Sequence, residues 1–175
     1  MSGRRAVFVD RDGTVIEDAH YASSPDQVRV VPGAAEALRV LRDEGFLLAV
    51  VSNQSGIGRG LITPEQAAAV HERFVSELER LGVRFDAVRY CPHTPDEGCV
   101  CRKPAPGLIL DAADEIGAAP SQSFMIGDSL LDVTAGRAAG CRTIALGARG
   151  GTGADWTASS WSEVVDIVRA VRNAA

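Results

Sequence analysis

The chain has 175 residues, of which 46% are hydrophobic and 23% are charged, with a formal net charge of -5. A chain of this size buries about 70% of the surface that it exposes when unfolded, so we predict one globular domain spanning residues 1–175. The negative charge disfavours nonspecific nucleic-acid binding, which requires a cationic surface. The apolar runs are too short to cross a bilayer, and no secretory apolar region follows the N-terminal arginine pair. We therefore expect a cytoplasmic protein with no membrane partner.

Short apolar runs alternate along the chain with segments of helical pattern. The apolar runs are 6–9, 47–51, 87–90, 123–126 and 143–146. The helical segments are 33–44, 63–81, 107–116, 131–139 and 160–173. Continuous apolar runs are typical of parallel strands that are covered on both faces. The alternation predicts an α/β fold with a Rossmann-like, doubly wound parallel sheet, in which the segment 147–160, rich in glycine, serine and threonine, is a loop without an assigned function.

Polar side chains follow the predicted strands at the points where these end. Asp10 follows the first strand, Ser52 and Asn53 the second, Cys91 the third and Asp128 the fourth. Ligands of an open parallel sheet bind beyond the carboxyl ends of its strands. We therefore expect these separate segments to meet at one rim of the sheet.

Two carboxylates lie two residues apart in the segment FVDRDGTVI, where a buried strand becomes a turn. Side chains at that spacing in an extended chain point the same way. Asp10 and Asp12 can therefore face one substrate, the first as a nucleophile and the second as a general acid and base. The alternative is a simple Asp-Gly turn at the end of a strand.

A second pair of carboxylates, Asp128 and Asp132, lies at a predicted strand end that leads into a helix. In one interpretation Asp128 only caps that helix and Asp132 is a solvated acid of its first turn. In the other, these groups join Asp10 and Asp12 at the rim, where close like charges repel by about 4 kcal/mol each. A cation would then be required, and hard oxygen ligands indicate Mg²⁺.

Positive charge for a phosphate at the same rim is available from Lys103. Ser52 and Asn53 can donate hydrogen bonds to the oxygens of a phosphoryl group. The turn-rich run SNQSGIGRG also offers Arg59 for a second anionic group, although a plain surface loop is the alternative interpretation of that run.

Four zinc-type ligands lie within one short segment in the pattern Cys-x-His-x5-Cys-x-Cys, namely Cys91, His93, Cys99 and Cys101. A closed Cys₃His set without an open position is typical of structural Zn²⁺, and the alternatives are free thiols or a redox pair. Such a zinc-binding loop would direct Arg102 and Lys103, which follow it, toward a phosphate bound at the rim of the sheet. Cys141 stands apart and is expected in the core.

The order of these motifs resembles that of the haloacid-dehalogenase superfamily: an aspartate pair, a strand-end serine, a lysine and a late Gly-Asp segment. The resemblance covers about residues 7–146. It implies a phosphatase, a phosphoric monoester hydrolase, and these catalytic residues: the nucleophile Asp10, the general acid and base Asp12, and the phosphoryl binders Ser52 and Lys103.

The same resemblance implies the metal ligands and the openness of the site. The catalytic Mg²⁺ would be held by Asp10, Asp128 and the backbone carbonyl of Asp12. Only 39 residues separate Asp12 from Ser52, and a loop and a helix use them, so we expect a capless enzyme.

A capless layout with this zinc loop resembles the branch of the superfamily that hydrolyses heptose bisphosphates or histidinol phosphate. The runs SNQSGIGRG and RKPAPG match the heptose members, whereas the five-residue gap between His93 and Cys99 matches the histidinol members. Ile16 stands where the heptose members usually carry asparagine. We expect a sugar bisphosphate of carbohydrate metabolism as the substrate, with histidinol phosphate as the alternative. The expected substrate-binding residues are Asp18, Tyr21, Ser52, Asn53, Arg59, Arg102, Lys103 and Ser129.

Two further classes remain as alternatives to a small-molecule phosphatase. An open site would also admit a nucleic-acid 3'-phosphatase, and a zinc knuckle can serve as a non-enzymatic binding module. The acidic composition argues against both, because each would use a basic surface. We therefore expect a monomer that acts on a small sugar phosphate and has no nucleic-acid partner.

Overall fold

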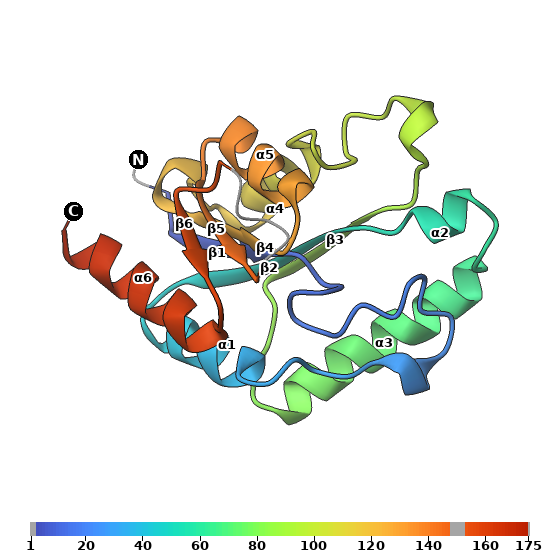
Figure 1. Cartoon of the computed structure of the whole chain (residues 1–175), viewed down its shortest axis with the longest axis horizontal. Coiled ribbons are helices and arrows are strands. Elements are labelled where there is room, and N and C mark those ends of the chain that lie inside the picture. Colours follow the sequence, from blue (N-terminus) through green and yellow to red (C-terminus); the bar gives the residue numbers. More distant parts are fainter. Residues whose placement is uncertain (1–2, 148–152, 175) are drawn as a thin grey trace.

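The computed structural model describes residues 3–147 and 153–174 of the chain (Figure 1). Its centre is a parallel sheet of six strands in the order β3-β2-β1-β4-β5-β6. The strands are β1 (Ala6–Val9), β2 (Leu47–Asn53), β3 (Ala87–Cys91), β4 (Phe124–Gly127), β5 (Arg142–Leu146) and β6 (Trp156–Ala158). The strand order runs outward from β1 in both directions, so the prediction of a doubly wound parallel sheet is confirmed.

Helices cover both faces of this sheet (Figure 1). The α-helices are α1 (Ala34–Asp43), α2 (Ser55–Gly58), α3 (Pro64–Arg80), α4 (Gly107–Ile116), α5 (Leu130–Ala139) and α6 (Trp161–Asn173), and the 3-10 turns are η1 (Pro25–Gln27), η2 (Pro95–Glu97) and η3 (Pro120–Gln122). Hydroxyl groups cap three of the longer helices: Thr63, Ser129 and Ser160 each accept a hydrogen bond from the backbone three residues later. Such caps stabilise a helix by about 1 kcal/mol each.

Alternate residues of the central strands enter two separate hydrophobic cores. Val7 and Val9 of β1 belong to the core that α1, α3 and α6 cover, whereas Ala6 and Phe8 belong to the core under α4 and α5. All four side chains are fully buried. Burial on both faces explains why these strands read as continuous apolar runs rather than as alternating patterns.

The expectation of a loop over 147–160 is wrong in its later part, because residues 156–158 form the edge strand β6. Asp155 holds this segment beside β5: its carboxylate accepts hydrogen bonds from the backbone and the hydroxyl of Thr143, at 2.8 and 2.9 Å. Because Asp155 and Thr143 are twelve residues apart, no local sequence pattern predicts this contact. Residues 148–152 of the expected loop lie outside the described residues.

The connections that follow β1 and β2 determine how open the rim is. Between Asp12 and Ser52 the chain forms η1 and α1 before it enters β2, and between Asn53 and Lys103 it forms α2, α3, β3 and η2. Within residues 3–147 and 153–174 there is thus no separate cap domain. None of the helices in this part of the chain is both long and apolar enough to span a membrane.

Candidate active site

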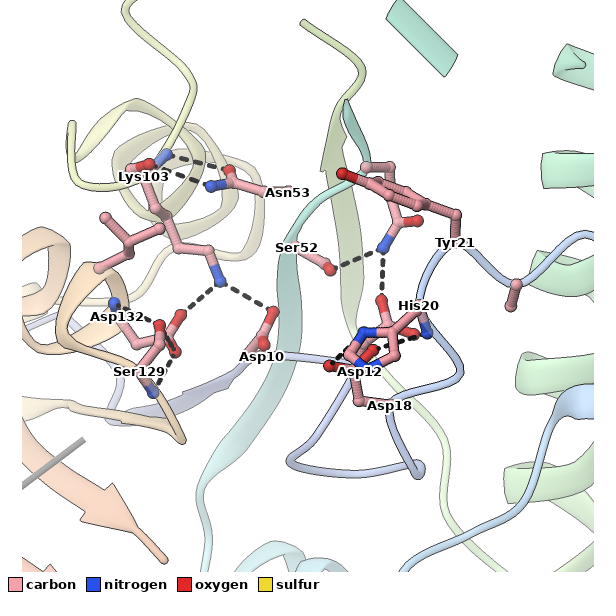
Figure 2. A pocket seen from close by; sticks show the side chains of 13 residues that line it. Asp10, Asp12, Asp18, His20, Tyr21, Ser52, Asn53, Lys103, Ser129 and Asp132 are labelled. Atoms are coloured by element: carbon pink, nitrogen blue, oxygen red, sulfur yellow. Dashed lines mark hydrogen bonds and ion pairs between the residues drawn. The ribbon is translucent and has the colours of Figure 1, made fainter. Parts of the chain in front are cut away.

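A cavity of about 290 Å³ lies at the rim where β1 and β2 end (Figure 2). Eight of the predicted site residues line this cavity: Asp10, Asp12, Asp18, Tyr21, Ser52, Asn53, Lys103 and Ser129. Asp132, which one interpretation of the sequence placed at this rim, also lines the cavity. The lining residues that the sequence did not indicate are His20, Ala22, Gln54 and Leu131. The structure therefore brings most of the predicted polar residues from distant segments into one place.

The ammonium group of Lys103, the only lysine of the chain, lies between two carboxylates at the floor of the cavity. Its Nζ donates hydrogen bonds to Asp10 Oδ1 at 2.8 Å, to Asp132 Oδ1 at 2.5 Å and to the backbone carbonyl of Val51 at 2.8 Å. The residue is only 2% exposed. Because a buried cation without partners would be very costly, this three-way pairing fixes the lysine directly beside Asp10.

Burial and charge compete in setting the protonation of this pair. Burial raises the pKa of Asp10 to about 7, even though Lys103 favours the ionised carboxylate. Burial opposes the charge of Lys103, but Asp10 and Asp132 outweigh it and raise the pKa of the lysine. Two carboxylates thus share one ammonium, and a further cation near Asp10 would favour the ionised form that a nucleophile requires.

A third carboxylate completes what we call the carboxylate cluster: Asp10, Asp128 and Asp132, whose oxygen atoms lie within 4.8 Å of one another. Oxygen ligands at this spacing fit a small divalent cation such as Mg²⁺. The interpretation of Asp132 as a solvated acid is wrong, because the residue is 1% exposed. Gly127 makes room for it, since a Cβ there would lie 2.3 Å from Asp132 side-chain atoms.

Asp12 lies on the opposite side of the cavity, and its carboxylate is held by two neighbours. Arg11 contacts it through Nε at 3.2 Å and through Nη2 at 3.0 Å, and the amide of Gln54 donates a hydrogen bond to its Oδ2 at 2.6 Å. The side chain of Asp12 remains 24% exposed. Asp10 and Asp12 therefore reach one cavity, as the spacing of the pair predicts, although in different surroundings.

Asn53 and Ser129 each fix one charged residue at the cavity, Lys103 and Asp132 respectively. The Asn53 amide exchanges two 3.0 Å hydrogen bonds with the backbone of Lys103, which ties the lysine to the end of β2. The Ser129 hydroxyl donates to Asp132 Oδ2 at 2.6 Å while it caps α5. Both side chains line the cavity, and both also fix the direction of a charged neighbour.

The turn of residues 18–21 forms another part of the cavity wall. His20 and Tyr21 have φ angles of +47° and +66°, which only a few per cent of non-glycine residues adopt. Asp18 holds the turn by accepting a 3.0 Å hydrogen bond from the backbone of His20. Strained backbone of this kind gathers at functional sites, and here it places the half-exposed Tyr21 at the cavity.

Two predicted substrate contacts do not line this cavity. Arg59 is exposed at the end of α2, and the guanidinium of Arg102 donates a 3.2 Å hydrogen bond to the carbonyl of His93. A substrate that extends out of the cavity would be needed to meet them, so their contact with substrate remains a prediction.

The predicted zinc ligands form what we call the Cys₃His cluster: Cys91, His93, Cys99 and Cys101. Their sulfur atoms are 3.2, 3.4 and 3.6 Å apart, and His93 Nδ1 lies 3.4 Å from Cys91 and 3.3 Å from Cys101. A tetrahedral Zn²⁺ at about 2.3 Å from each sulfur needs sulfur separations of about 3.8 Å. A small outward movement would therefore suffice to accommodate the ion.

Two features together define the class of protein: the sheet order and a nucleophile-type aspartate paired with lysine at the rim. A "HAD-hydrolase-like" family model matches residues 100–173. A D-glycero-beta-D-manno-heptose-1,7-bisphosphate 7-phosphatase of Yersinia pestis is 37% identical over 94% of this chain and 95% of that protein. The chain thus belongs to the haloacid-dehalogenase-like phosphatases and is an enzyme that hydrolyses phosphate esters.

A further relative carries the same name, and a similar solved structure carries a related one. The enzyme of that name from Escherichia coli K12 is 35% identical over 94% of this chain and 93% of its own length. The crystal structure of a D,D-heptose 1,7-bisphosphate phosphatase from B. bronchiseptica, complexed with magnesium and phosphate, superposes with a TM-score of 0.86 at 29% identity, covering 95% of this chain and 99% of that chain.

Proposed function

We propose that this enzyme is a Mg²⁺-dependent phosphatase that removes the 7-phosphate of a heptose 1,7-bisphosphate through an aspartyl-phosphate. The substrate is suggested by the descriptions of the relatives in Yersinia pestis and Escherichia coli. The observation that carries the chemistry is the contact of Lys103 Nζ with Asp10 Oδ1 at 2.8 Å, in the same cavity as the carboxylate of Asp12.

In the first proposed step, a carboxylate oxygen of Asp10 attacks phosphorus, and the bond from phosphorus to the sugar oxygen breaks. Asp12 gives its proton to that oxygen, because a sugar alkoxide is a poor leaving group. Lys103 and the Ser52 hydroxyl are placed to stabilise the charge that develops on the phosphoryl oxygens. The products of this step are the sugar hydroxyl and an aspartyl-phosphate.

In the second proposed step, Asp12, now a carboxylate, removes a proton from water as the water oxygen attacks phosphorus. The bond between phosphorus and the Asp10 oxygen breaks, which releases inorganic phosphate and restores both aspartates. The sum is ester plus water giving alcohol plus phosphate, with Asp12 back in its protonated form.

The carboxylate cluster would hold the Mg²⁺ of this proposal through side-chain oxygens of Asp10 and Asp128, together with the predicted backbone carbonyl of Asp12. When bound, Mg²⁺ supplies positive charge that offsets the repulsion between a dianionic phosphate and the aspartates. Asp132 is buried against Lys103 and Ser129, so we assign it to orienting the lysine.

The Cys₃His cluster would hold a structural Zn²⁺, because four protein ligands leave no position for water or substrate. Zinc would fix the loop that leads directly into Arg102 and Lys103. Thiolate ligands require reduced cysteines, which supports the expected cytoplasmic location. We also keep the expected monomer as part of the proposal.

The substrate assignment can be tested by comparing phosphate release from three esters: D-glycero-β-D-manno-heptose 1,7-bisphosphate, histidinol phosphate and a 3'-phosphorylated oligonucleotide. We expect kcat/KM to favour the heptose bisphosphate by at least about 100-fold. Phosphorus NMR of the product should show the 1-phosphate retained. A preference for histidinol phosphate or for the oligonucleotide would overturn this substrate and select the corresponding alternative.

A further inference from the structure

Gln54 lies between two residues of the proposed mechanism and contacts both. Its Nε2 donates hydrogen bonds to Asp12 Oδ2 at 2.6 Å and to Ser52 Oγ at 2.9 Å. The residue follows the last residue of β2, lines the cavity and is 9% exposed. One buried amide thus links the proposed acid to the proposed phosphoryl binder.

The direction of this amide is determined by its partners. The carbonyl oxygen of Gln54 accepts a 2.9 Å hydrogen bond from Nη2 of Arg11. A guanidinium can only donate and a carboxylate can only accept. The Gln54 oxygen must therefore face Arg11, and its NH₂ group must face Asp12.

Arg11 is itself fixed by buried contacts with other elements. It is 2% exposed, and its guanidinium carbon lies 5.2 Å from the ring centroid of Tyr90 in β3. The Tyr90 hydroxyl is hydrogen-bonded to Nδ1 of His71 in α3 at 2.9 Å. The amide of Gln54 is thus anchored, through Arg11, to a strand and a helix that lie outside the cavity.

The Asp12 carboxylate depends on such an anchor because it is the more exposed partner of the catalytic pair. Its side chain is 24% exposed, against 12% for that of Asp10. The amide contact comes from a different strand end and fixes its direction relative to Ser52. A displacement of about 1 Å at a reacting group can cost about 100-fold in rate.

We propose that Gln54 is a positioning residue that holds Asp12 in register with the phosphoryl group bound at Ser52. This inference rests on the proposed function. Loss of the Gln54 amide should therefore affect the two proposed steps differently when the substrate has a good leaving group. A 4-nitrophenolate departs without a proton, so the first step then no longer needs the acid, whereas the second step still needs the base.

The test uses the Gln54→Met variant, which keeps a side chain of similar length and removes the amide, in the complete Mg²⁺-loaded enzyme. With 4-nitrophenyl phosphate we expect a burst of about one nitrophenolate per enzyme, with a rate constant within about 3-fold of the wild-type first step. We expect the steady-state rate to fall by about 10- to 100-fold. With a sugar phosphate, the first step itself should slow by a similar factor.

The matched control is Gln66→Ala, which also removes an amide hydrogen bond, here one of 2.8 Å to the backbone of Thr63 at the start of α3. It should leave both kinetic phases unchanged. Equal losses of burst and steady-state rate in Gln54→Met, or no loss in either, would overturn the positioning role. Absence of phosphate release by the wild-type enzyme from any ester would refute the proposed function instead.

Discussion

The carboxylate cluster and the Cys₃His cluster both gather ligand-type side chains, but different parts of the protein hold them in place. Asp10, Asp128 and Asp132 come from the ends of two central strands and the start of a helix, and Lys103 joins two of them through a buried ion pair. The Cys₃His cluster lies within residues 91–101, around one loop at the end of the edge strand β3.

This difference predicts which cluster needs its metal ion to keep its local structure. The strand ends are fixed by two hydrophobic cores and by Lys103, so the carboxylate cluster is organised by the fold itself. Thiols are weak hydrogen-bonding groups, so a bound Zn²⁺ would be the main restraint on the four ligand side chains, while contacts to the backbone such as that of Arg102 with the His93 carbonyl hold part of the loop. Loss of Mg²⁺ should therefore stop chemistry and leave the fold unchanged, whereas loss of Zn²⁺ should loosen a loop.

The largest expected effect is the loss of turnover when the proposed nucleophile of the carboxylate cluster is replaced. Asp10→Asn should reduce kcat by at least about 10⁴-fold, because an amide cannot form the aspartyl-phosphate. Phosphate release from a sugar phosphate measures this, and metal analysis should still find about one zinc per chain. Residual activity above about 1% of wild type would contradict the role assigned to Asp10.

The next effect is on stability and tests whether the fold alone holds the carboxylate cluster. Lys103→Met should lower the free energy of unfolding by about 3–5 kcal/mol, since it leaves two buried carboxylates without their ammonium. Urea denaturation measures the change. Adding Asp132→Asn should recover part of the loss, and a purely additive further loss would contradict the ion-pair account.

A smaller effect should follow from breaking the Cys₃His cluster. Cys99→Ser should lose zinc and lower kcat/KM by about 10-fold, because Lys103 follows the loop directly. Hydrogen exchange should quicken in residues 91–103 and stay unchanged in β1 and β4.

The control for that experiment is Cys141→Ser, which changes a buried thiol outside the cluster. It should retain zinc. If Cys99→Ser kept a full complement of zinc, or if its β1 amides exchanged faster as well, the loop would not be an independent metal-dependent element.

The smallest expected effect separates helix capping from support of the site. Ser129→Ala and Ser160→Ala each remove an N-cap, and each should cost about 1 kcal/mol of stability. Only Ser129 also donates to Asp132, so only its variant should lower kcat, by a few-fold. Thermal unfolding and steady-state kinetics on both variants provide the comparison, and equal kinetics would exclude a supporting role for Ser129.

How much the sequence could predict depends on how local each feature is. The Cys₃His cluster lies in one short segment, so spacing alone predicts it completely. The apolar runs predict the strands β1 to β5, most clearly those that are buried on both faces, but β6 depends on the contact of Asp155 with Thr143 and was expected as a loop.

The candidate catalytic rim could be predicted in part for the same reason. Asp10 and Lys103 stand in recognisable motifs, whereas the burial of Asp132 depends on the space left by Gly127 and on a lysine from a distant segment. Gln54 carries no charge and belongs to no ligand pattern, so only the folded chain reveals that it contacts Asp12. The one sequence signal for Asp132 was its position four residues after Asp128, at the start of a predicted helix.

The most direct test of the central claim is to identify the residue that becomes phosphorylated. Enzyme mixed with a sugar phosphate or an aryl phosphate and Mg²⁺, quenched in acid during turnover and digested, should yield a phosphoryl adduct on the peptide that contains Asp10, with fragment masses that place it on that residue. The Asp10→Asn variant should yield none. Turnover without any adduct, or an adduct on Asp12, would contradict the proposed mechanism.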